Sequence, residues 1–212
     1  LSRGVDPDGG DPADLLLQAV RDEGVGVLPW GAAAQRLRAR GAYAGLDCWS
    51  DDGLMHRLDD WLPALLRGRR RLGDVPPAAL HDALLALVDW AQRQRLDQMA
   101  PAEYRTPAGS THPIDYAAEG GPTVCARVQS LFGLSRHPTI GQPPVPLILS
   151  LTSPAGRPIQ TTRDLPGFWR GSWADVAKEM RGRYPRHPWP DAPWDADATL
   201  RTKRADARHR TP

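Results

Sequence analysis

The spacing of apolar residues changes near residue 102, and this change constrains the fold more than any other feature. Upstream of it, Leu, Val, Ala and Trp recur at helical spacing, as they do on helices that bury one face. Downstream, short β-branched and apolar runs are separated by turns rich in Gly and Pro, which is typical of strands. The sequence therefore predicts an α+β chain, with an N-terminal helical bundle over residues 12–101 and a β unit after it.

The predicted helices carry recognisable start and stop signals. Asp11 followed by Pro12 is an N-cap with Pro at the first helical position, and Gly24 ends that helix. Ser50 can cap a later helix, whose apolar stripe contains Pro63. A proline removes one helical hydrogen bond, so we expect a kink or a break at Pro63.

Residues 102–165 predict five strands with a short helix between the third and the fourth. The strands lie in YRTPAGSTHPIDYA, TVCARVQSLFG, VPLILSLTS and RPIQTT, and the end of the second of these stretches forms the helix. This order of elements is that of an OB-type barrel. We therefore expect this segment to close into a small OB-like β-barrel.

A C-terminal helix and a Pro/Trp-rich extension are predicted over residues 166–197. Ser172 and Asp175 have the spacing of a capping box. The prolines of the extension stiffen it, because each fixes a backbone angle. Some aromatic residues of this region are expected to anchor it, with an ordinary place in the core as the alternative. These anchors are Trp169, Trp173, Tyr184 and Trp189.

The bulk properties fit a globular protein. The chain has 212 residues and is 41% hydrophobic, which allows a real core. No apolar run approaches the roughly 18 residues that span a bilayer, so no membrane partner is expected. Cys48 and Cys125 lack metal-ligand spacing, which favours reduced thiols in a cytoplasmic protein. Residues 1–11 are interpreted as a linker or truncated edge, and residues 198–212 as a basic disordered tail.

Charge is unevenly distributed along the chain. Residues 1–102 hold 12 Lys and Arg against 15 Asp and Glu, a net charge of −3, whereas residues 103–212 hold 15 against 10, a net charge of +5. The second half is therefore expected to face an anionic partner. A plain solvated surface is the alternative for these cations. The candidate nucleic-acid-binding residues are Arg127, Arg136, His137, Arg157, Arg163, Lys178, Arg181, Arg183 and Arg186.

The printed sequence contains no common catalytic motif. It lacks the P-loop pattern, a DExH box, HExxH, GxGxxG and GxSxG. We therefore predict no catalytic residue, no metal site and no cofactor site in this chain.

Several stretches together resemble one family. They are RLDQMAPAEYRTPAGSTHPIDYA, VQSLFGLSRHPTI, VPLILSLTSPAGRPIQTTRDLPGFWRGSW and VAKEMRGRYPRHPWPDAP. They are similar to the C-terminal region of bacterial HrpB-type ATP-dependent helicases, of the DEAH/DExH-box class. The resemblance runs from about residue 25 to about residue 204.

The resemblance implies an accessory role. The RecA-like motor domains, which use ATP and Mg, would lie N-terminal to Leu1, so whether this chain counts as an enzyme stays undecided. The chain would bind single-stranded nucleic acid, with RNA expected, and couple it to that motor. The alternative is a docking module of the same helicase that makes no nucleic-acid contact.

Overall fold

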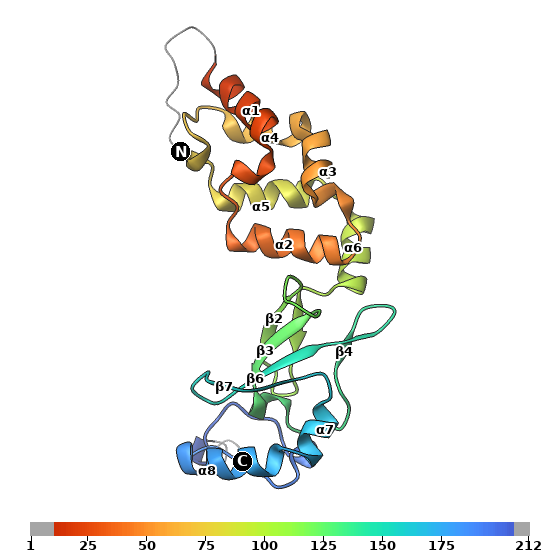
Figure 1. Ribbon diagram of the computed structural model, residues 1–212, viewed down its shortest axis with the longest axis vertical. Helices are drawn as coiled ribbons and strands as arrows, with labels where there is room; N and C mark the ends of the chain where they lie inside the picture. The colour runs from red at the N-terminus through yellow and green to blue at the C-terminus, as the bar shows by residue number, and fades with distance from the viewer. Residues whose placement is uncertain (1–10, 206–212) are drawn as a thin grey trace. The chain divides into compact units, whose positions relative to one another are not determined.

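The computed structural model describes residues 11–205 of the protein (Figure 1). The chain divides into two compact units, Leu1–Ala100 and Pro101–Pro212. The first unit is helical and the second contains the sheet. This confirms the predicted α+β class and its order, with helices first.

The helical unit packs apolar helix faces around fully buried Leu and Trp side chains. Its α-helices and short 3-10 turns, in chain order, are α1 Pro12–Glu23, η1 Val25–Val27, α2 Ala32–Tyr43, η2 Asp47–Trp49, α3 Asp51–His56, α4 Leu58–Leu66, η3 Leu72–Asp74, α5 Pro77–Ala86 and α6 Trp90–Met99. Trp49 links two of these elements, because its indole Nε1 donates to the carbonyl oxygen of Leu84 in α5 at 2.7 Å.

The predicted helix starts are confirmed, but the expected effect of Pro63 is not. The side chains of Asp11 and Ser50 accept hydrogen bonds from backbone N–H groups of α1 and α3, each at 3.0 Å. Pro63 lies inside α4, and the helical path breaks earlier, at Arg57. The Trp61 indole donates to the Leu54 carbonyl oxygen at 3.1 Å, which holds the two helices together across that break.

The sheet of the second unit has the strand order β1-β2-β3-β6-β7. β3 and β6 are parallel and the other neighbours are antiparallel. A short hairpin, β4-β5, lies in the connection between β3 and β6. The strands are β1 Glu103–Arg105, β2 Thr111–Asp115, β3 Thr123–Arg127, β4 Thr139–Ile140, β5 Val145–Pro146, β6 Ile148–Thr152 and β7 Pro158–Thr162.

The predicted OB-like barrel over residues 102–165 is not confirmed, because the sheet is open. Closure would require its edge strands β1 and β7 to pair, and within residues 11–205 they do not. The short helix predicted before the fourth strand is a 3-10 turn, η4 Val128–Leu131. The apolar face of the sheet packs in one core with α7 Leu165–Arg170 and α8 Trp173–Arg183, which lie beside β6 and β7 (Figure 1). The buried residues of the sheet therefore share one core with these helices.

The last helix, α8, starts after Ser172 as predicted, but the C-terminal region differs from the prediction in two other respects. α7 was not predicted; Asp164 caps it by accepting from the Gly167 N–H at 2.9 Å. The predicted capping box of Ser172 and Asp175 is wrong. The Ser172 hydroxyl bonds instead to the Gln160 side chain on β7, at 3.0 Å.

Residues 184–199, here called the strap, fold back over the sheet unit. The Trp173 indole donates to the Pro190 carbonyl oxygen at 2.8 Å, and the Gly133 N–H donates to that of Pro193 at 2.8 Å. The buried Thr199 donates its backbone N–H to the Gln129 carbonyl oxygen at 3.1 Å. Part of the tail predicted to be disordered is therefore docked. Residues 1–10 and 206–212, which belong to the predicted edge and tail, lie outside the described residues.

Candidate nucleic-acid interface

The strand β3 carries an exposed cation at one end of the sheet. Val124 and Ala126 point into the core, whereas Arg127 is exposed. Arg127 lies opposite Thr152 of β6, and Thr152 lies opposite Pro158 of β7. Arg157 directly precedes Pro158, so the register brings Arg127 and Arg157 to the same end of the sheet.

The strap and the residues that follow it add further cations at this end of the sheet. The Ser153 hydroxyl, at the end of β6, accepts from the Arg157 N–H at 3.1 Å and donates to the Tyr184 hydroxyl at 3.3 Å. Arg186 follows Tyr184 by two positions, and its carbonyl oxygen accepts from the Lys203 N–H at 2.8 Å.

His187 shows how close these charges are. Burial, and then the positive charge of Arg127, lower the pKa of His187, while a hydrogen bond to the Arg201 backbone acts in the opposite direction. Arg127 and Arg201 therefore both lie near this ring. We call the resulting group the cationic cluster: Arg127, Arg157, Arg186, Arg201 and Lys203.

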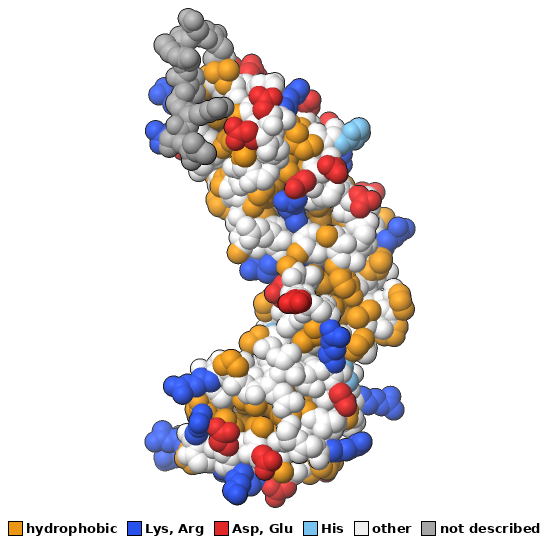
Figure 2. Space-filling view, in the orientation of Figure 1, with side chains coloured by type: hydrophobic (Ala, Val, Ile, Leu, Met, Phe, Trp, Pro, Cys, Tyr) orange, Lys and Arg blue, Asp and Glu red, His pale blue; other side chains and the backbone are white. Residues whose placement is uncertain are grey.

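The cationic cluster is free to bind an anion. All of its side chains are exposed, and none forms an ion pair with another residue of the described range 11–205. Figure 2 shows Lys and Arg side chains around the margin of the sheet unit, with hydrophobic side chains between them. Arg201 and Lys203 were not among the predicted site residues, because the tail that contains them was expected to be disordered.

Three of the predicted arginines bind other parts of the protein. Arg181 donates through Nε and Nη2 to the Trp189 carbonyl oxygen, at 3.1 and 2.7 Å, and forms an ion pair with Asp191. Arg183 forms an ion pair at 3.0 Å with Glu179, one helical turn away. Arg163 donates to the carbonyl oxygen of Gly120. These contacts fasten α8, the strap and the end of β7.

His137 is held by backbone groups through both ring nitrogens. The Leu165 N–H donates to Nδ1 at 3.0 Å, so Nδ1 bears no hydrogen. Nε2 therefore carries the hydrogen, and it lies 2.7 Å from the Leu147 carbonyl oxygen, which accepts it. The ring retains no donor for a phosphate.

The last two predicted cations lie outside the cluster. Arg136, in the loop before β4, and Lys178, on the outer face of α8, are exposed and form no ion pair with any residue between 11 and 205.

The predicted anchors are core residues. Trp169, Trp173 and Trp189 are buried, and Tyr184 packs against the same core. The Trp169 and Trp173 rings meet edge to face with centroids 5.2 Å apart, and those of Trp173 and Trp189 are 6.0 Å apart. Buried rings cannot stack on bases, so these residues position the strap.

A basic loop in the helical unit was not among the binding sites predicted from the sequence. Arg67, Arg69, Arg70 and Arg71 surround Gly68 between α4 and η3, and none forms an ion pair within the described part of the chain. The run RGRRR was a visible signal, but the net negative charge of the first half concealed it.

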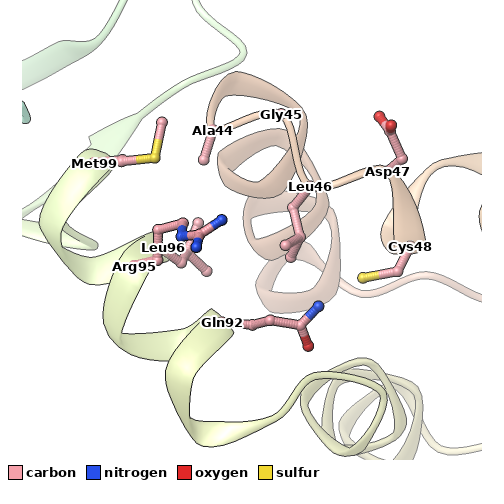
Figure 3. Close-up of a pocket in the computed structure, with 9 residues that line it drawn as sticks. All are labelled: Ala44, Gly45, Leu46, Asp47, Cys48, Gln92, Arg95, Leu96 and Met99. Atoms are coloured by element: carbon pink, nitrogen blue, oxygen red, sulfur yellow. The ribbon is translucent and has the colours of Figure 1, made fainter.

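The helical unit contains a pocket of about 260 Å³ between the turn after α2 and one face of α6 (Figure 3). The side chains of Gln92 and Cys48 point toward one another across it. Burial raises the pKa of the Cys48 thiol, so the thiol stays protonated at neutral pH and is a weak nucleophile. No histidine lines the pocket to act as its base.

Other site types have no support in residues 11–205. That range holds no group of three or more His, Cys, Asp or Glu side chains arranged to bind a metal ion. Its helices are all too short or too polar to span a bilayer.

Comparison with known proteins identifies relatives. Residues 61–193 match the HrpB_C family, described as ATP-dependent helicase C-terminal. The chain is 41% identical over 198 residues to the ATP-dependent RNA helicase HrpB of Escherichia coli K12. This alignment covers 89% of the chain and 24% of the relative.

Two solved structures also match. A crystal structure of the E. coli DExH-box NTPase HrpB gives a TM-score of 0.77 at 39% identity and covers 93% of this chain and 25% of that one. A structure of the E. coli DEAH/RHA helicase HrpB gives 0.66 at 38% identity, with 87% and 24% covered. The chain thus spans about a quarter of the length of each of these relatives.

Proposed function

Because the chain belongs to the ATP-dependent helicase C-terminal family of HrpB proteins, we propose that it is the nucleic-acid-binding part of a helicase. It binds single-stranded RNA and couples that strand to RecA-like motor domains outside this chain. ATP and Mg act in those motor domains. The RNA preference rests on the E. coli relative, which is named as an ATP-dependent RNA helicase.

The cationic cluster is the observation that carries this proposal. Guanidinium and ammonium groups that lack internal partners can bind phosphates and release counterions, which gives affinity with little sequence preference. The cluster joins the end of β3, the turn before β7, the strap and the residues that directly follow the strap. A strand that follows it would contact the sheet and the strap together.

Salt titration of RNA binding tests the proposal. The wild-type chain should bind a labelled single-stranded oligoribonucleotide at low salt, with an affinity that falls as salt rises. Replacing Arg127, Arg157 and Arg186 by Gln should weaken binding. The slope of log K against log salt should fall by up to about 2, since each phosphate contact on a single strand contributes about 0.7.

A variant with the same loss of charge elsewhere is the control. In it, Arg67, Arg70 and Arg71 of the basic loop are replaced by Gln. We expect it to retain most of the affinity and the slope. An equal loss in both variants would show that binding depends on overall charge and not on the cationic cluster, and a loss in this control alone would place the site in the helical unit.

One observation favours a second function, docking onto the motor domains. Trp90, at the start of α6, is 71% exposed, and tryptophan is enriched among the residues that anchor protein interfaces. If the chain only docks, it should bind no RNA even at low salt. Trp90→Ala should then weaken its association with motor domains supplied as a separate polypeptide.

A further inference from the structure

The sheet unit contains a pocket of about 310 Å³ with aromatic and cationic walls. Its lining residues are Ser135, Pro166, Trp169, Arg170 and Trp194. Trp169 closes it from inside the core and donates its indole N–H to the Leu134 carbonyl oxygen at 3.0 Å. Trp194 is 42% exposed and presents its ring to solvent. No residue of this pocket belongs to the cationic cluster.

Trp194 is held in place by its neighbours. It lies in the short turn η5 Pro193–Asp195, whose first residue is buried. The Gly133 N–H donates to the Pro193 carbonyl oxygen at 2.8 Å, which fixes η5 to the chain below it. A ring that is half exposed yet fixed from behind can stack with little loss of conformational entropy on binding.

The charge of the pocket is positive. Arg170 is exposed and forms neither an ion pair nor a side-chain hydrogen bond with any other residue of the described chain. Arg136, which follows the lining residue Ser135 in the chain, is a second exposed cation. Asp195, which follows Trp194, is the acidic neighbour. Two cations against one acid suit a ligand that carries negative charge.

We propose that this pocket takes one unstacked nucleobase of a single strand, a step that rests on the proposed RNA binding. The base stacks on Trp194, and Arg170 contacts the adjoining phosphate. Proteins that bind single strands with little sequence preference combine an aromatic ring, on which a base stacks, with a nearby cation that contacts the phosphate.

The size of the pocket favours a base over a protein partner. A volume of about 310 Å³ is at the small end for ligand pockets, which suits one flat ring with its sugar. A docked helix would instead need a groove with several anchor positions along it. The pocket exposes one aromatic ring and thus matches a single base.

Two labelled strands of equal length separate stacking from phosphate contact. One is an oligoribonucleotide, and the other is the same backbone with abasic residues. The wild-type chain should bind the base-containing strand more tightly. Trp194→Ala should weaken binding of that strand by roughly 5- to 100-fold and leave the abasic strand unaffected. Trp194→Phe should restore part of the preference, and Arg170→Gln should weaken both strands.

Trp90→Ala is the matched control, because it removes another exposed indole from the helical unit. It should retain the preference for bases. If Trp194→Ala, folded as judged by circular dichroism, keeps the wild-type preference, the base site is excluded while RNA binding stands. If the wild-type chain binds neither strand at low salt, the proposed function fails and the base site fails with it.

Discussion

Arg181 and Trp189 are joined by two hydrogen bonds, in which Nε and Nη2 of the arginine donate to one backbone carbonyl oxygen at 3.1 and 2.7 Å. The same Nη2 forms an ion pair with Asp191, so one side chain of α8 binds the strap at two positions. The planar guanidinium suits this role, because its donors are held in a fixed fork. Arg181, predicted to bind nucleic acid, instead stabilises the fold.

Removing that fork should destabilise the sheet unit. We expect Arg181→Ala to lower the free energy of unfolding by about 1–2 kcal/mol, since hydrogen bonds from a charged donor are lost. Arg181→Lys should recover only part of it, because Lys keeps the charge but not the fork. Arg183→Ala is the control and should cost about 0.5 kcal/mol or less, as its pair with Glu179 is exposed. Urea unfolding followed by circular dichroism measures all three, and equal effects of the two Ala variants would contradict the assigned role.

Replacing the two tryptophans of the strap should change stability by very different amounts. Trp189 is buried and packs against Trp173, so Trp189→Ala should lower the free energy of unfolding by about 3–5 kcal/mol. Trp194 is half exposed, and Trp194→Ala should change it by about 0.5 kcal/mol or less. Limited proteolysis should cut the strap sooner in the first variant. Equal stability of the two variants would show that Trp189 does not anchor the strap.

Signals between neighbouring residues made much of the fold predictable. The caps at Asp11 and Ser50 bond to residues two and three positions away, so the sequence contains the whole motif. Ser172 had an equally good local signal, yet its hydroxyl bonds to Gln160, 12 positions back in the strand β7. The closure of a sheet depends on such distant partners throughout, which is why the barrel was predicted and an open sheet is found.

The positive charge of the candidate site could be predicted from the sequence, but the residues that form the site could not all be predicted. Charge located it in the second half, and Arg127 and Arg186 are exposed there as expected. Composition could not show that Arg163 binds Gly120, 43 positions away, because that contact exists only in the folded chain. Trp194 was not among the predicted site residues, because its position beside a pocket depends on the folded path of the strap.

His137 should matter for folding and not for RNA binding. Phe in its place keeps a ring of similar size but leaves the Leu165 N–H and the Leu147 carbonyl without their partners. We expect His137→Phe to lower the free energy of unfolding by about 1–3 kcal/mol, the cost of a buried polar group left unpaired. RNA affinity at a temperature where the variant is folded should stay at the wild-type value. Weaker RNA binding with unchanged stability would reassign His137 to phosphate contact.

His187 should report on the cationic cluster through its pKa. Burial and the charge of Arg127 lower that pKa, so the unfolded chain takes up the proton more readily than the folded one. Well above the ordinary histidine pKa of about 6.5, His187 is neutral in both states and should not affect the free energy of unfolding. As the pH falls below that value, through the lower pKa of His187 in the folded chain, the free energy of unfolding should decrease. His187→Gln should remove that part of the pH dependence, as measured by unfolding at a series of pH values.

Two changes near His187 should each raise its pKa, as followed by NMR titration of the imidazole signals. Arg127→Gln removes the nearby positive charge, and the imidazolium then forms more readily. Single-stranded RNA bound at the cluster brings phosphates close to the ring and stabilises the imidazolium in the same way. Arg163→Gln is the control and should leave the pKa unchanged, because Arg163 lies outside the cluster. If saturating RNA fails to raise the pKa of His187 while Arg127→Gln does, the strand binds elsewhere on the chain.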